Sequence, residues 1–173
     1  FSFMRLSGAD PILGVEMLST GEVACLGENF ADAFSKALQS AEFKIPISNG
    51  AVLITVSGDE LKKKVAPLAW TLRSLGFKIY ATEHTAEALQ NAGLNDLIVL
   101  HKVRETDKKP NILQYLLRRE IDLVVNIPTA NNHISSTEMH TEVLEDEYVI
   151  RRLAVEFNIP VVTNLELASA SVK

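Results

Sequence analysis

The stretch AVLITVSGDELKKKVAPLAWTLRSLGFKIYA, residues 51–81, decides the fold class. Its first six residues form an almost continuous apolar run, which is typical of a strand covered by helices on both faces. In residues 60–75, leucine and valine recur every three or four positions, which predicts a helix. Gly76 then provides a C-cap, and FKIYA (77–81) reads as a second strand. This order of elements predicts a βαβ unit with parallel strands.

The same alternation continues along the rest of the chain. Further strands are expected at residues 97–100, 121–127 and 159–164, and further helices at residues 85–91, 110–119 and 146–157. The polar stretch 128–145 lacks a convincing period and is expected to be a loop. The sequence therefore predicts an α/β fold, a Rossmann-like three-layer sandwich with a mainly parallel sheet of about five strands.

The residues before this region are organised differently. EVACLG, residues 22–27, reads as a strand that could add a sixth pairing to the sheet, and residues 29–41 are expected to form an amphipathic helix. Residues 43–50, with Pro46 and an Asn-Gly pair, read as a linker. We therefore expect two segments with a boundary near Pro46.

Charge and composition narrow the class of protein. The net charge of −5 argues against nucleic-acid binding, which needs a basic face to neutralise phosphates. No apolar run approaches the roughly 20 residues that span a bilayer, so no membrane partner is expected. Cys25 is the single cysteine, which favours a reducing compartment. Because the chain begins at Phe1 within a patterned segment, we expect it to belong to a longer protein.

Polar side chains are concentrated in the loops that follow the predicted strands. In an open parallel sheet, ligands bind beyond the carboxyl ends of the strands, where loops and helix N-termini meet. Four segments of this kind are TVSGDELK, ATEHT, HKVRETDKKP and NIPTANN. Helix N-termini carry unpaired N–H groups and a partial positive charge, so a phosphate or a carboxylate is the expected ligand.

Individual residues of these loops allow two interpretations. Thr82 and Thr85 are either N-caps of the following helix or hydroxyls that hold an anion. Lys62 and Lys102 are ordinary surface charges when taken singly, but two cations that converge on one site would suit a dianion. Asn126 is either a turn cap or an amide that contacts a ligand.

Catalytic motifs are missing from the sequence. There is no GxxxxGK[ST] phosphate loop, no GxGxxG after a strand, no HExxH or CxxC metal pattern and no GxSxG nucleophile elbow. His133 and His140 are interpreted as polar filler of a loop rather than metal ligands. We therefore expect no catalytic residue and no metal site in this chain.

Two segments resemble a known family. ADPILGVEMLSTGEVACLG, residues 9–27, resembles the stretch that closes the second ATP-grasp half of the carbamoyl-phosphate synthase large subunit. Residues 50–167 resemble that subunit's C-terminal regulatory domain, which shares its fold with methylglyoxal synthase; the matching segments are AVLITV, GFKIYATEHT, IDLVVNIP and DEYVIRRLAVEFNIPVVTN. The resemblance implies the end of the ATP-grasp region and a linker in residues 1–46, and a methylglyoxal synthase-like allosteric domain in residues 47–173.

The resemblance also implies a function. The domain would bind an allosteric effector and catalyse nothing itself, within an enzyme that makes carbamoyl phosphate from bicarbonate, ammonia or glutamine, and ATP, for pyrimidine and arginine synthesis. ATP and Mg would be cofactors of the parent enzyme and not of this segment. The implied partners are a small anionic effector, the rest of the large subunit, a glutaminase subunit or domain, and further copies of the chain. The implied location is the cytoplasm, or the mitochondrial matrix for the urea-cycle type.

The effector-binding residues follow by position from the resemblance. They are Thr55, Lys62, Thr82, Thr85, Lys102, Asn126 and Thr129. In this family the hydroxyls at Thr82 and Thr85 hold the anionic group of the effector, and Lys102 matches a lysine of the phosphate pocket. Asn126 matches a ligand asparagine. Thr129 and Glu147 stand where the N-acetylglutamate type has further asparagines.

The resemblance leaves the effector open. Thr129, Glu147 and Lys102 depart from the N-acetylglutamate type and favour a phosphorylated nucleotide such as UMP or IMP, whereas ATEHT and VNIPTANN are closer to the N-acetylglutamate type. A methylglyoxal synthase-type lyase is a further alternative. It would need an acidic GGDQQ-like loop after the third strand. This chain has VRETDKKP there, in which Asp107 could be offered as a base but the glycines that bring the backbone close to a substrate are missing.

Overall fold

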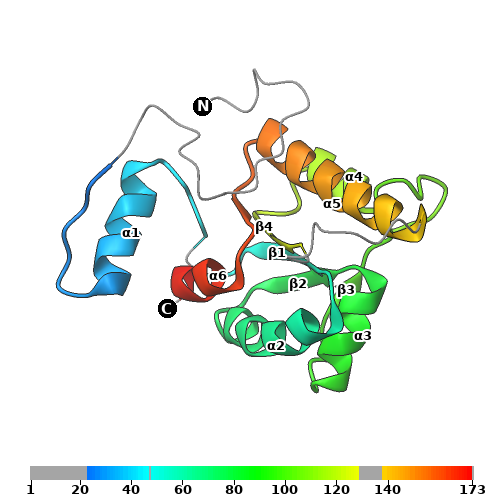
Figure 1. The fold of residues 1–173 in the computed structure, drawn as a ribbon, viewed down its shortest axis with the longest axis horizontal. Coiled ribbons are helices and arrows are strands. Elements are labelled where there is room, and N and C mark those ends of the chain that lie inside the picture. The colour runs from blue at the N-terminus through cyan, green and yellow to red at the C-terminus, as the bar shows by residue number, and fades with distance from the viewer. Residues whose placement is uncertain (1–22, 47, 129–137, 173) are drawn as a thin grey trace.

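A five-stranded parallel sheet forms the centre of the computed structural model, which describes residues 23–46, 48–128 and 138–172 (Figure 1). The strand order is β3-β2-β1-β4-β5. The strands are β1 (Ala51–Val56), β2 (Lys78–Ala81), β3 (Ile98–Val99), β4 (Leu123–Ile127) and β5 (Val161–Val162). The predicted α/β class with a parallel sheet is confirmed, and β1 has the predicted bounds.

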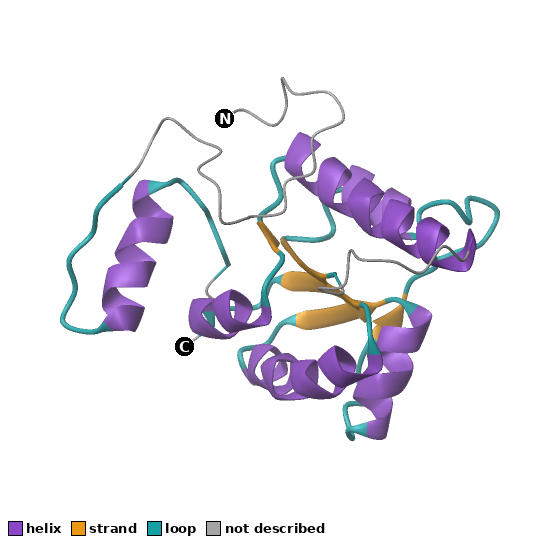
Figure 2. Ribbon diagram, viewed as in Figure 1, coloured by secondary structure: helices purple, strands orange, loops and turns teal. Residues whose placement is uncertain are grey.

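Helices cover both faces of the sheet, as Figure 2 shows. The helices are α1 (Phe30–Ser40), α2 (Asp59–Ser74), α3 (Glu83–Asn91), α4 (Ile112–Leu117), α5 (Glu138–Glu156) and α6 (Leu165–Ser171). One core cluster joins the sheet to α2, α3 and α6, and the other joins it to α4 and α5. The result is the expected three-layer sandwich.

The two core clusters show how β1 and β4 divide their side chains. Successive side chains of a strand point to opposite faces. In β1, Val52 and Ile54 belong to the cluster beneath α2 and α3, whereas Leu53 belongs to the cluster beneath α4 and α5. In β4, Val124 lies on the α5 side in the same way. Two residues further along, at the carboxyl end of each strand, a polar residue takes the place of an apolar one on this face.

Several element predictions need correction. Residues 138–145 were expected to form a loop, but α5 begins at Glu138. A periodicity argument detects a helix through its stripe of apolar residues. It misses a segment whose helix depends on intrinsic propensity and has no such stripe. The expected strand at 22–27 is wrong for its described part, residues 23–27, so no sixth pairing comes from that part. The expected strand at 159–164 shortens to β5, because Asn164 caps α6 by accepting from the Leu167 N–H at 3.0 Å.

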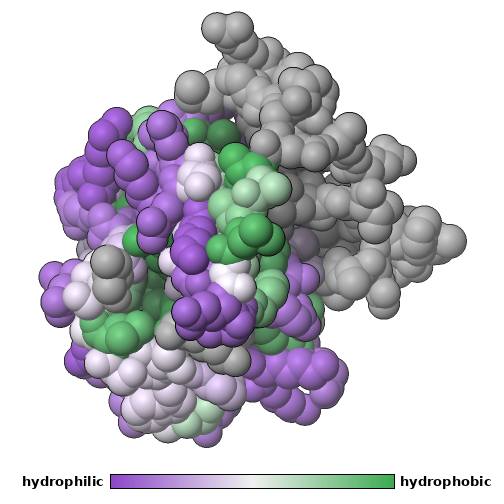
Figure 3. Space-filling model, turned by 90° about the vertical axis from the view of Figure 1, so that its left-hand side faces the viewer, coloured by the Kyte–Doolittle hydropathy of each residue, from purple (hydrophilic) through white to green (hydrophobic). Residues whose placement is uncertain are grey.

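Helix α1 confirms the helix expected at residues 29–41, but its apolar side chains are poorly covered. Asn29 is the N-cap, and its side chain accepts from the Asp32 N–H. No residue of α1 is buried, and the exposed Phe30 ring stacks on Phe34 with centroids 5.5 Å apart. Residues of α1, α2 and α6 line a pocket of about 520 Å³. Figure 3 faces this side of the molecule and shows apolar surface among hydrophilic residues.

Candidate functional site

Thr55 and Asn126 are the polar residues that end the α5-facing rows of β1 and β4. They are direct partners in the register of the parallel pair β1–β4. The Asn126 Nδ2 donates to the Thr55 Oγ1 at 2.6 Å, and both residues are buried. The sheet therefore joins these two predicted site residues below the loops at its carboxyl edge.

Arg151 lies beneath this pair and was not predicted as a site residue. Its side chain comes from α5, is buried, and donates from Nη1 to the Asn126 Oδ1 at 2.7 Å. Arg151 is four residues after Glu147 and three before Ala154, and both of these residues are buried in the folded chain. At that spacing the three residues share one helix face. An arginine on a buried face needs hydrogen-bonding partners, which polar strand ends can supply.

Thr85 closes the opposite side of the β1 end. The pairing of β1 with β2 stops at Ile54 and Ala81, so β2 offers no partner to the Val56 amide. The Val56 N–H donates instead to the Thr85 Oγ1 at 3.2 Å. Thr82 stands at the N-cap position of α3 without a side-chain capping bond, and its hydroxyl donates to the Thr85 Oγ1 at 3.2 Å. The two threonines are thus brought together beside β1.

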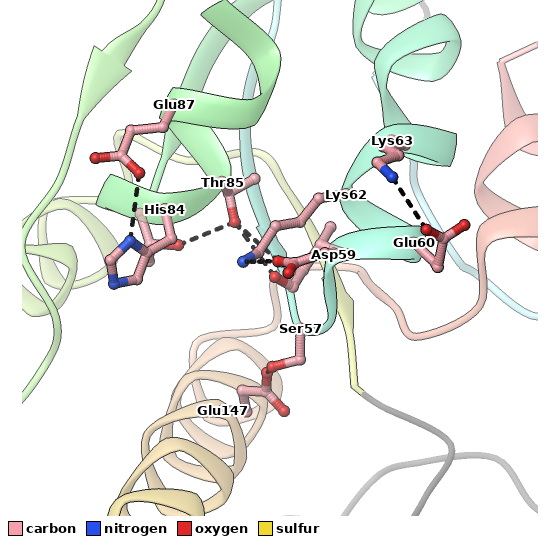
Figure 4. A network of polar contacts seen from close by, with 11 residues as sticks. Ser57, Asp59, Glu60, Lys62, Lys63, His84, Thr85, Glu87 and Glu147 are labelled. Carbon is pink, nitrogen blue, oxygen red and sulfur yellow. Dashed lines mark hydrogen bonds and ion pairs between the residues drawn. The ribbon is translucent and has the colours of Figure 1, made fainter. Parts of the chain in front are cut away.

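The two predicted cations both have carboxylate partners. Lys62 lies in the first turn of α2 and pairs with the exposed Asp59 at 3.1 Å (Figure 4). Lys102 follows β3 and pairs with the buried Asp146 of α5 at 3.4 Å, and the Arg104 Nε lies 3.5 Å from the same carboxylate. An anionic ligand at either lysine would therefore compete with a carboxylate of the chain.

A second carboxylate of α5 reaches the loop after β1. The Ser57 hydroxyl donates to Glu147, which is buried (Figure 4). Asp146 and Glu147 are neighbours in α5. Through them this helix contacts both the loop after β3, at Lys102, and the loop after β1, at Ser57. The structural role of Asp146 was not predicted. Thr129 lies outside the described residues.

The loop that carries Lys102 is held by its own polar contacts. The Asn111 Nδ2 donates to the backbone oxygens of Lys102 at 2.6 Å and of Glu105 at 2.9 Å. A hydrogen bond from Lys108, together with one from the Lys102 N–H, lowers the pKa of the Glu105 carboxyl. Glu105 therefore stays charged and fixes the backbone of Lys102. Asp107, the one acid offered as a base for lyase chemistry, is exposed in this loop.

The Thr55 hydroxyl is left with a donor to offer, whereas the Thr85 hydroxyl already donates to the Val56 backbone oxygen at 3.5 Å. The Thr55 oxygen accepts from Asn126, and the Thr85 oxygen accepts from both the Val56 N–H and the Thr82 hydroxyl. A hydroxyl has one proton and two acceptor positions. Thr85 has filled its acceptor positions, and among the described residues no acceptor lies within bonding distance of the Thr55 proton. Such a site suits a ligand with negatively charged oxygens.

Every helix in the described ranges is too short or too polar to cross a bilayer. No three histidine, cysteine, aspartate or glutamate side chains in these ranges are grouped as metal ligands would be.

The parallel sheet, with helices on both faces, defines an α/β domain of the open-sheet class. More specifically, the chain belongs to the family of MGS-like domains, whose model matches residues 64–163.

Relatives of the chain are segments of much larger proteins. Multifunctional protein pyr-3 of Neurospora crassa is 38% identical over 175 residues, which cover 100% of this chain and 9% of that protein. The carbamoyl phosphate synthase large chain, C-terminal section, of Methanopyrus kandleri is 36% identical and covers 100% of this chain and 29% of its own length. Carbamoyl-phosphate synthase [ammonia], mitochondrial, of Aquarana catesbeiana is 37% identical over 96% of this chain and 10% of its own. The chain thus spans less than a third of each.

A solved structure of methylglyoxal synthase from Elizabethkingia anophelis NUHP1 aligns with a TM-score of 0.48 at 18% identity, over 72% of this chain and 76% of that one.

Proposed function

We propose that this chain is the allosteric effector-binding domain of a carbamoyl-phosphate synthase. The names of the relatives from Methanopyrus kandleri and Aquarana catesbeiana support this assignment, because their similarity extends over nearly the whole chain. In this proposal, residues 1–46 are the end of the ATP-grasp region and a linker, and residues 47–173 are the allosteric domain. The chain would then work with the rest of the large subunit and with a glutaminase subunit or domain.

The effector is a phosphorylated nucleotide such as UMP or IMP, bound at the carboxyl edge of the sheet. The observation that carries this proposal is the buried Thr55 hydroxyl, whose oxygen already accepts from Asn126 and whose proton is left for a ligand. Lys62 and Lys102 supply positive charge at two of the neighbouring loops. Thr82 completes the hydroxyl set, and Thr129 belongs to the proposed site by position in the sequence.

N-acetylglutamate is the alternative effector. The similarity to the mitochondrial ammonia-type synthase favours it. Lys102, Thr129 and Glu147 oppose it, because the resemblance puts a different residue at each of these positions in the N-acetylglutamate type. For a nucleotide effector we propose a cytoplasmic setting, in keeping with the single Cys25. For N-acetylglutamate the mitochondrial matrix would apply.

Thermal melting with a ligand panel tests the proposal. A ligand that binds the folded state raises its stability by mass action, by about 2.7 kcal/mol at a concentration of 100 Kd. We expect UMP or IMP to raise the melting temperature, and N-acetylglutamate to leave it unchanged. The substitution Lys102→Ala should remove most of the shift.

Lys63→Ala is the matched control. Lys63 is on the same helix as Lys62, is well exposed and pairs with Glu60, so its loss should leave the ligand shift intact. A shift that survives Lys102→Ala would place the ligand elsewhere. The absence of a shift with all three ligands would refute the proposed function.

A further inference from the structure

The guanidinium of Arg151 is the most deeply buried cation among the described residues, with 3% of the residue exposed. Lys102 and Lys62, by comparison, have side chains that are 42% and 19% exposed. A buried charge is retained only where hydrogen bonds compensate its loss of water. One such bond goes to Asn126, which has no surface exposure at all.

The chemistry of arginine fixes the orientation of the Asn126 amide. A guanidinium has donors and no acceptor, so the atom it contacts at 2.7 Å must be the amide oxygen. The NH2 group then points to the other side, where it lies 2.6 Å from the Thr55 Oγ1. Without the arginine, either end of the amide could face Thr55, because a hydroxyl is able to donate as well as accept.

The amide orientation in turn decides what Thr55 offers to a ligand. Because the Thr55 oxygen accepts from Asn126, its proton is directed away from Asn126. If the amide were reversed, the hydroxyl would donate to the amide oxygen and would present only an acceptor, which repels an anion. In a low-dielectric interior, a chain of hydrogen bonds that starts at a cation also makes each following group a stronger donor.

We infer that Arg151 is a positioning residue for anion binding: through Asn126, it makes the Thr55 hydroxyl a donor to an oxyanion of the effector. This inference rests on the proposed function for the ligand, and on the described contacts for the chain of bonds. These hydrogen bonds join α5, β4 and β1. A helix behind the sheet therefore determines whether Thr55 offers a donor or an acceptor at the carboxyl edge.

Arg151→Met tests the inference, because methionine keeps an apolar stem of similar length and removes every donor. Arg152→Met is the matched control, since Arg152 is the next residue of α5 and pairs with Glu156 at 3.1 Å. The probes are UMP and inorganic phosphate, measured by titration calorimetry. Loss of a hydrogen bond to a charged group corresponds to about a tenfold to hundredfold weaker Kd. We expect this loss for Arg151→Met and less than a twofold change for Arg152→Met.

A double-mutant cycle separates positioning from a general loss of structure. In the background of Thr55→Val there is no hydroxyl to orient, so Arg151→Met should weaken binding further by less than about twofold. Arg151→Lys, which keeps a cationic donor, should recover part of the affinity. Equal losses in both backgrounds, or no recovery with lysine, would refute the positioning role.

The side-chain amide resonances of Asn126 provide a test that needs no ligand. In the unsubstituted protein the two NH2 protons should be distinct and slow to exchange, and in Arg151→Met they should exchange rapidly. If neither probe binds while the amide is held in this way, the proposed function fails and Arg151 still orients Asn126. If both probes bind equally well to Arg151→Met, or its amide signals are unchanged, the inference is wrong and the proposed function stands.

Discussion

Thr85→Val removes one oxygen from the site at nearly constant shape, and its consequences can be worked out from the contacts. The Val56 N–H donates to this oxygen at 3.2 Å, and the β1–β2 pairing ends before it reaches Val56. Valine therefore leaves a buried amide without an acceptor. An unsatisfied buried donor costs about 1–3 kcal/mol. For a domain of 150–250 residues each kcal/mol lowers the melting temperature by about 2–4 °C, so we expect a fall of about 2–12 °C.

Two controls and a local probe sharpen this experiment. Thr85→Ser keeps the hydroxyl and should retain most of the stability. Thr71→Val removes an exposed hydroxyl that bonds the Pro67 oxygen within α2, and its effect should stay within about 0.5 kcal/mol. Hydrogen exchange at the Val56 amide should accelerate in Thr85→Val and not in Thr71→Val. If Thr85→Val melts like Thr71→Val and the Val56 amide stays protected, the proposed bond does not hold β1.

Three further substitutions test other parts of the structure. Leu53→Ala, in the centre of β1 and fully buried, should cost about 2–5 kcal/mol in a denaturant titration; a loss below 1 kcal/mol would contradict the packing. Asp146→Asn removes the carboxylate that pairs with Lys102, so the Kd for UMP should fall; an unchanged Kd would mean that Lys102 does not meet the ligand. The pKa of Glu105 is lowered by Lys108 and by the Lys102 N–H, so its bonds stabilise the fold above the ordinary carboxyl pKa and are lost as the pH falls through the lowered value. In Glu105→Gln the melting temperature should therefore depend less on pH below about pH 5. A melting temperature that varies with pH as it does in the unsubstituted protein would count against the bond.

The sequence predicted the central part of the fold well because its signal there is local. β1 is apolar except at Thr55 and is followed by a regular apolar stripe, so its strand and helix are visible without any knowledge of their neighbours. The edge strands β3 and β5 are only two residues long, and their limits depend on contacts with β2 and β4 that no local pattern encodes. The first part of α5 was missed because no period marks it.

The loops that form the candidate site were predicted from the sequence, but the hydrogen bonds and ion pairs between its residues were not. The carboxyl-edge rule for parallel sheets placed Thr55 and Asn126 in the same region, and the register of β1 and β4 then joined them. The partners of the lysines were not predictable, because Asp146 is far from Lys102 in the sequence and ion pairs have no periodicity. Arg151 was overlooked for a related reason: the Arg-Arg pair of α5 looks like an exposed face until the helix is packed on the sheet.

The burial of Arg151 also bears on how the site responds to dissolved salt. Counterions screen exposed charges within a Debye length of about 10 Å at 0.1 M, but they screen a buried charge much less. Lys102 and Arg104 are about half exposed, so their attraction for an approaching anion should weaken as salt is added. The influence of Arg151 passes through two short hydrogen bonds inside the protein and should persist. Ionic strength would then slow the arrival of the ligand more than it loosens the ligand once bound.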